Sequence, residues 1–171
     1  MRNLPIKALL VAAIALGTSP SAISRDDDEG RLQGVWRMTR MGVNCQTGLQ
    51  AGPSFQAIVI FNEDGTVVGY AVPPGSTPAL GSPEFGVWKR EHGKGNYSFS
   101  DLSYNYDAGG AFAGSIEIAA TVQVEDGGKT LAQQTKIEFF DGNGALLFSV
   151  CGKATGTRFR LTRNPLGARA Q

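Results

Sequence analysis

The side chains in this sequence that could do chemistry are amphipathic aromatic and polar groups. Tyr70, Trp88, Tyr104 and Tyr106 each combine an apolar ring with one polar atom. Such groups pack against apolar ligands while the O–H or N–H fixes the orientation of the ligand. They are candidate ligand-binding residues if their strands line a cavity. The alternative is that they fill a core, because a barrel of about eight strands can be packed without a pocket.

Two further candidates, Gln133 and Thr135, are polar residues on an otherwise apolar strand face. Residues two apart in a strand point to the same side, so both share a face with Leu131, Ile137 and Phe139. Buried polar groups need hydrogen-bond partners. Either these two face a polar lumen that holds a ligand or water, or this end of the strand lies near the barrel mouth.

No catalytic or metal-binding signature stands out in the sequence. Most carboxylates lie in predicted turns, and Glu117 and Glu138 lie on strand faces that we expect to be exposed. No two of them are placed as the differently buried pair that acid–base catalysis needs. The only histidine, His92, lies in a Gly-rich turn, whereas zinc takes about four ligands. We therefore expect no catalytic residue, no metal and no cofactor.

The elements that must position these side chains are β-strands. Runs of apolar and β-branched residues recur between turn signals such as Asp64-Gly65, which is typical of a hairpin. The expected strands cover residues 32–41, 55–61, 66–72, 85–90, 97–106, 115–124, 130–140, 145–151 and 154–161. Residues 73–83 hold four prolines, which excludes a strand and predicts one long loop acting as a lid or rim.

This pattern predicts an all-β fold, a single antiparallel up-and-down barrel of about eight to nine strands. Consecutive hairpins favour a meander, and closing the meander into a barrel removes the exposed strand edges. An open β-sandwich is the alternative.

The first and last predicted strands resemble those of the lipocalin (calycin) barrel. Gly34 and Trp36 form a Gly-x-Trp on the first strand, and Arg158 and Arg160 lie on the last. The resemblance implies that Trp36 packs across the closed end of the barrel and that a late arginine covers it. We expect that arginine to be Arg160, because Phe159 should face the core.

Further sequence blocks within residues 31–160 are similar to a family of small exported bacterial β-barrel proteins whose activity is not established. The blocks are Asn44-Cys45-x-Thr47-Gly48, Ser82-Pro83-x-x-Gly86-x-Trp88, Phe139-Phe140-Asp141-x-x-Gly144 and Cys151-x-x-Ala154-x-Gly156-x-Arg158-Phe159. The resemblance implies export to the bacterial periplasm or to the medium.

The N-terminal 24 residues have the features of a secretory signal peptide. Arg2 and Lys7 precede an apolar run over residues 8–16, which is followed by small residues up to a cleavage site within 21–24. The apolar run is too short to span a membrane as a helix, so we expect no membrane anchor. Beyond it we expect an acidic mobile lead-in over residues 25–31, the barrel domain over 32–162 and a frayed tail over 163–171.

Charge and cysteine content restrict the partners and the compartment. Residues 1–24 take two of the 16 basic residues and none of the 15 acidic ones, so the rest has a net charge of −1. This balance gives no electrostatic footprint for nucleic acid. In an exported chain, the pair Cys45 and Cys151 predicts a disulfide; two free buried thiols are the alternative.

Together these features predict an exported, non-enzymatic protein that holds a small hydrophobic or amphipathic ligand in its barrel. One alternative is an interaction or inhibitor protein that acts through its surface or its N-terminal arm. A second is a barrel isomerase or cyclase.

Overall fold

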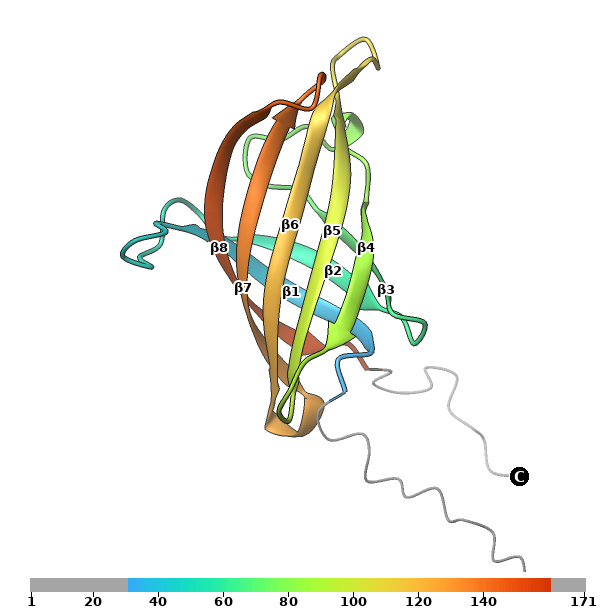
Figure 1. Ribbon diagram of the computed structural model, residues 1–171, viewed down its shortest axis with the longest axis vertical. Coiled ribbons are helices and arrows are strands. Elements are labelled where there is room, and N and C mark those ends of the chain that lie inside the picture. The colour runs from blue at the N-terminus through green and yellow to red at the C-terminus, as the bar shows by residue number, and fades with distance from the viewer. Residues whose placement is uncertain (1–30, 161–171) are drawn as a thin grey trace, which may run out of the picture.

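Alternation of apolar and polar residues builds eight strands in residues 31–160, the part of the chain that the computed structural model describes (Figure 1). The strands are β1 (Gly34–Val43), β2 (Phe55–Phe61), β3 (Thr66–Ala71), β4 (Glu84–Arg90), β5 (Asn96–Tyr106), β6 (Phe112–Glu125), β7 (Thr130–Asp141) and β8 (Leu146–Arg158). Two 3₁₀ turns, η2 (Pro78–Leu80) and η3 (Asp126–Gly128), are the helices of this region, and neither could cross a membrane. The predicted signal peptide, the lead-in up to residue 30 and the tail lie outside the described residues.

The eight strands form a closed, antiparallel up-and-down barrel, which confirms the predicted fold class. Each strand pairs with its neighbours in sequence, and β1 also pairs with β8 to close the barrel. The hairpins β5–β6 and β7–β8 and the loop that carries η2 lie at one end, the upper end in Figure 1. The hairpins β2–β3 and β4–β5 and the turn η3 lie toward the lower end.

One strand boundary predicted from the sequence is wrong. Residues 145–151 and 154–161 were expected to be two strands, but they form the single strand β8. Gly152 does not turn the chain; it pairs with Gly42 of β1 and with Thr135 of β7. A Cβ at this position would collide with the Thr135 hydroxyl, so the glycine makes room for a side chain inside the barrel.

The lower end is closed around Trp36, as the lipocalin-like pattern predicts. Trp36 is fully buried, and its Nε1 donates a hydrogen bond to the Leu32 carbonyl at 2.7 Å. The Arg158 guanidinium lies 4.4 Å from the centre of the Trp36 ring and donates to the backbone carbonyls of Arg31, Gln33 and Gly128. These bonds connect the segment that leads into β1 with the end of β8.

The arginine that covers Trp36 is therefore Arg158 and not Arg160. Inward positions on β8 are the even-numbered residues, and the strand ends at Arg158, so Arg160 lies beyond it and is exposed. Phe159 points outward, is 50% exposed and lies 4.8 Å below the Arg37 guanidinium instead of facing the core.

Edge-to-face aromatic contacts fill the rest of the lower end. The ring of Phe61 lies 5.5 Å from Phe99 and 6.2 Å from Trp88, and Trp88 lies 5.7 Å from Tyr97. The indole N–H of Trp88 donates to the Asn62 carbonyl at 2.9 Å. These rings complete a solid core that leaves the upper half to carry a site.

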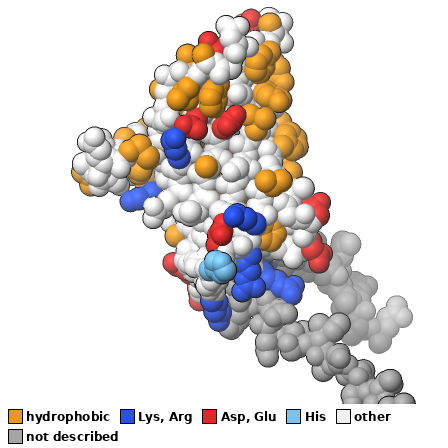
Figure 2. Space-filling model, viewed as in Figure 1, with side chains coloured by type: hydrophobic (Ala, Val, Ile, Leu, Met, Phe, Trp, Pro, Cys, Tyr) orange, Lys and Arg blue, Asp and Glu red, His pale blue; other side chains and the backbone are white. Residues whose placement is uncertain are grey.

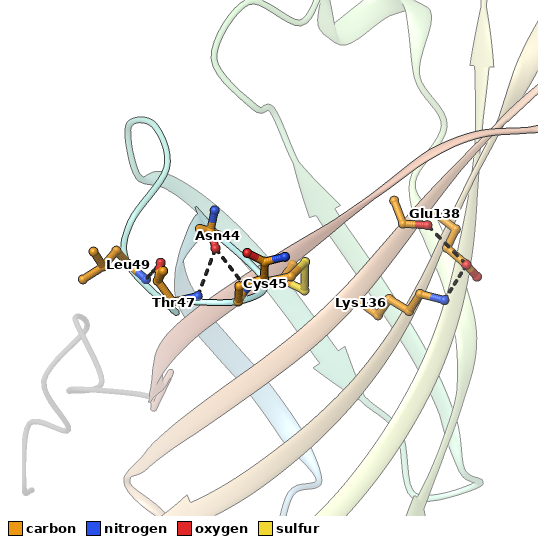
Figure 3. Close-up of a disulfide and its surroundings, with 9 residues drawn as sticks. Asn44, Cys45, Thr47, Leu49, Lys136 and Glu138 are labelled. Atoms are coloured by element: carbon orange, nitrogen blue, oxygen red, sulfur yellow. Dashed lines mark hydrogen bonds and ion pairs between the residues drawn. A yellow bond between two sulfur atoms is a disulfide. The ribbon is translucent and has the colours of Figure 1, made fainter.

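A disulfide fastens the long β1–β2 connection to the outside of the barrel (Figure 3). Cys45 and Cys151 are bonded, with their Cα atoms 5.2 Å apart, as the sequence predicts. The Asn44 side chain accepts hydrogen bonds from the backbone N–H groups of Gln46 and Thr47, which shapes the turn around Cys45. Lys153, also on β8, donates to the Gly48 carbonyl at 3.3 Å and holds the same loop.

We predict that replacing Trp36 by alanine lowers the free energy of unfolding by about 3–5 kcal/mol, the usual cost of truncating a buried aromatic side chain. Trp88→Ala is the comparison, and it should cost less because Trp88 is only partly buried. Denaturant titrations of both variants measure the difference. An unchanged midpoint for Trp36→Ala would show that this residue does not close the barrel.

We also predict that the double substitution of Cys45 and Cys151 by serine lowers the free energy of unfolding by roughly 2–5 kcal/mol, because the bond closes a long loop across 106 positions. Denaturant titration of the variant and of the oxidised protein gives the value. Alkylation of both thiols in the folded, unreduced protein would contradict the bond itself.

Candidate ligand-binding cavity

The upper half of the barrel encloses a cavity of about 530 Å³. The loop over residues 73–83 contributes to its wall through Pro73, Ser76, Pro78 and Leu80, so this loop forms part of the rim. The loop is held in place where Ser82 bonds Tyr104: the backbone N–H of Ser82 donates to the Tyr104 carbonyl, and the Ser82 hydroxyl accepts from the Tyr104 N–H, both at 2.9 Å.

The cavity walls are mainly apolar. Residues of β6, β7 and β8 that point inward supply aliphatic and aromatic surface, and Phe55 and Val72 supply more from the opposite side. The inward residues of the three long strands are Ile116, Ile118, Ile137, Phe139 and Val150. A chamber of this size and lining is typical of sites for small organic ligands, which combine apolar walls with a few polar groups.

The floor of the cavity carries a buried ion pair. Arg40 of β1 donates from both terminal nitrogens to Glu84 of β4, at 2.5 Å and 2.8 Å, and each residue is 8% exposed. Gly69 of β3 makes room for the pair, because a Cβ there would collide with the Glu84 carboxylate. Burial disfavours the charged guanidinium, but the hydrogen bonds and charge of Glu84, with the charge of Asp101, outweigh burial and raise the pKa of Arg40. Arg40 therefore stays protonated.

Asp101 of β5 is a second buried carboxylate at this level of the barrel. It is 5% exposed, and neither carboxylate oxygen has a hydrogen-bond partner among residues 31–160. Its strand partner Ile118 and the next inward residue on β5, Ser103, both line the cavity. Burial and the nearby negative charge of Glu84 raise the pKa of Asp101 to about 7, against the opposing effect of Arg40.

Gln133 of β7 adds a polar group from the far side of the floor. It is 3% exposed and lines the cavity, and its side-chain oxygen has no partner in the described part of the chain. The Nε atom of Arg40 is also unpartnered there. Because buried polar atoms normally make hydrogen bonds, these three acceptors and one donor indicate that polar ligand atoms or water bind at this level of the barrel.

The structure brings together four of the six residues predicted as ligand-binding candidates. Tyr106, Gln133 and Thr135 line the cavity, and Tyr70 does so while remaining 45% exposed. The low exposure of Gln133 rules out a position at the barrel mouth and leaves the polar lumen as the explanation for it.

Two of the predicted candidates do not reach the cavity. Trp88 points inward but lies at the closed end, where it packs on Phe61 and Tyr97. Tyr104 is 43% exposed and packs edge-on against Phe112, 5.6 Å away, on the outside of the β5–β6 hairpin. Trp88 is therefore a core residue, and Tyr104 is a surface residue.

The charged floor was not predicted from the sequence. Strand alternation does indicate that these residues point inward: Arg40 follows Trp36 and Met38 at two-residue steps, and Asp101 follows Phe99 in the same way. Charged residues are almost never fully buried unless paired, which favours assigning them to the outer face. The partners Arg40 and Glu84 lie on strands that are not neighbours, so they meet only across the lumen of the closed barrel.

Comparison with known proteins gives no assignment for this site: no protein-family model matches the chain, and no curated protein matches it. Among residues 31–160, no three His, Cys, Asp or Glu side chains are grouped so that they could hold a metal ion. The function must therefore be inferred from the cavity.

We predict that stability falls as pH rises through the titration of Asp101. The unfolded chain loses this proton near pH 4 and the folded protein near pH 7, so the folded state binds more protons between these values. Asp101→Asn should remove the slope and raise the free energy of unfolding at pH 8, by at most about 4 kcal/mol.

Denaturant titrations at pH 4.5 and pH 8 measure this effect. Glu117→Gln, which changes an exposed carboxylate on the outer face of β6, is the matched control and should leave the pH dependence unaltered. Equal pH dependence in Asp101→Asn and the unmodified protein would show that Asp101 titrates normally.

Proposed function

We propose that this is an exported, non-enzymatic binding protein that holds a small hydrophobic or amphipathic ligand in the upper half of its barrel. The observation that carries the proposal is the cavity of about 530 Å³, whose apolar walls end on a buried polar floor. The walls would bury the apolar part of the ligand, at roughly 25 cal/mol per Å² of apolar surface. The floor would orient its polar end.

The rim supports the same proposal. The proline-rich loop withholds backbone donors and has restricted φ angles, so less conformational entropy is lost when a ligand orders it. Hydrophobic side chains also gather on the outside of the upper end in Figure 2, whereas basic ones lie mostly toward the lower end. The exposed apolar residues of the two long hairpins include Phe112, Leu146, Leu147 and Phe148. An apolar ligand would therefore meet apolar surface as it approaches.

Export is part of this proposal and is supported by the disulfide between Cys45 and Cys151. Disulfides form and persist in the periplasm and outside the cell, and they are rare in the reducing cytosol. Both oxygens of Glu84 accept hydrogen bonds from Arg40, which holds this carboxylate in place at the floor.

We predict that N-phenyl-1-naphthylamine, a probe that is uncharged at neutral pH and fluoresces in apolar surroundings, binds in the cavity. Ile137→Trp should weaken its binding at least tenfold, because Ile137 lines the cavity and the larger side chain occupies part of its volume. A tenfold loss corresponds to about 1.4 kcal/mol. Fluorescence titration gives both affinities.

The matched control is Ile58→Trp, the same substitution at a residue that is 54% exposed on the outer face of β2. It should leave probe affinity unchanged. Absence of saturable binding to the unmodified protein, or equal affinities for the two variants, would contradict a ligand site inside the barrel.

A further inference from the structure

The side chains at the floor of the cavity indicate which kind of head group the ligand has. This inference rests on the proposed binding function. The charged side chains that face one another there are Arg40 of β1, Glu84 of β4 and Asp101 of β5. The neighbours of Asp101 on the adjacent strands are Gly86 and Ile118, which carry no charge. One cation therefore faces two carboxylates.

The cation is already engaged. Both terminal nitrogens of Arg40 donate to Glu84, which leaves only its Nε without a partner in residues 31–160. An anionic head group, such as a fatty-acid carboxylate, would have to compete with Glu84 for Arg40 while lying close to Asp101. Two like charges that lie close together repel strongly inside a protein, because the effective dielectric constant there is lower than in water. The arrangement disfavours anionic ligands.

The unpartnered groups at the floor are mostly acceptors. Both oxygens of Asp101 and the side-chain oxygen of Gln133 are buried and lack a donor within the described residues. A head group that donates several hydrogen bonds would satisfy them, and one that also carries a positive charge would balance the second carboxylate. An ammonium group, with three N–H donors and no acceptor, has this combination.

We propose that the ligand is an apolar amine, bound with its ammonium group at the floor close to Asp101, whose neighbours Ile118 and Ser103 line the cavity, and with its hydrocarbon part against the walls formed by β6, β7 and β8. Ile116, Ile137 and Phe139 supply those walls. Arg40 is a positioning residue: it neutralises Glu84 and so leaves Asp101 as the charge that the ligand meets.

Three probes of equal chain length separate the contribution of the head group from that of the cavity: octylamine, octanol and octanoate. Each displaces N-phenyl-1-naphthylamine from the full protein, and the displacement gives its affinity. At pH 8 we expect octylamine to bind at least tenfold more tightly than octanol, and octanoate to bind most weakly.

The preference for the amine should depend on the charge of Asp101. Alkylamines stay protonated throughout pH 6–8, since amines of this type have a pKa of about 10. Asp101 loses its proton near pH 7, so the advantage of octylamine over octanol should shrink at pH 6. Asp101→Asn should abolish the advantage at pH 8, and saturable binding of N-phenyl-1-naphthylamine to this variant shows that the cavity is intact. Glu117→Gln, on the outer face, should change nothing.

The outcomes distinguish the two proposals. If octanol binds but octylamine has no advantage, or if octanoate binds as tightly as octylamine, the amine proposal is overturned and the binding function stands. Retention of the preference in Asp101→Asn would also overturn it. If none of the three displaces the probe, the amine proposal fails; if the probe itself does not bind, both fail.

Discussion

Pairing of β1 with β8 is the constraint on which the other features depend. Because β1 is bonded on both sides, to β2 and to β8, its alternation is fixed, and Trp36, Met38 and Arg40 must all point into the barrel. Residues four apart in a strand are separated by about 13 Å. One strand therefore supplies both the side chain that closes the lower end and the cation at the floor of the cavity.

Burial of the charged side chains at the floor lowers the stability of the fold, so their presence there indicates a role other than stability. A buried ion pair seldom stabilises a protein more than apolar residues of the same size would, because both charges lose their hydration. Asp101 adds a third ionisable group with no hydrogen-bond partner among the described residues, and its raised pKa reflects that cost. Perturbed carboxylates of this kind cluster at functional sites. A ligand that brings a positive charge and N–H donors would offset the cost of burying Asp101, whereas a purely apolar ligand would not.

Much of the fold could be predicted from local sequence patterns, because turns and alternation are local properties. The hairpin at Asp64-Gly65 and the alternating run that became β6 were located correctly, and the proline-rich segment is a loop. The two strands expected over residues 145–151 and 154–161 form one strand, because the role of Gly152 between them depends on Thr135 of the neighbouring strand. The choice of Arg160 over Arg158 failed because both residues are even-numbered, and only the end of β8 at Arg158 decides between them. To predict the charged floor, one would also have to know that β1 and β4 face each other across the lumen.

The difference between the two halves of the barrel follows from side-chain size rather than from the course of the backbone. In the lower half the inward positions hold Trp36, Phe61, Phe99 and Leu131, which fill the cross-section of an eight-stranded barrel. In the upper half several inward positions hold small residues: Ser103, Thr135, Gly152 and Ala154. Protein interiors are normally close-packed, so a run of small residues around one level leaves a chamber that stability alone does not require. The same architecture thus provides a packed end that holds the fold together and an open end in which a ligand can be bound.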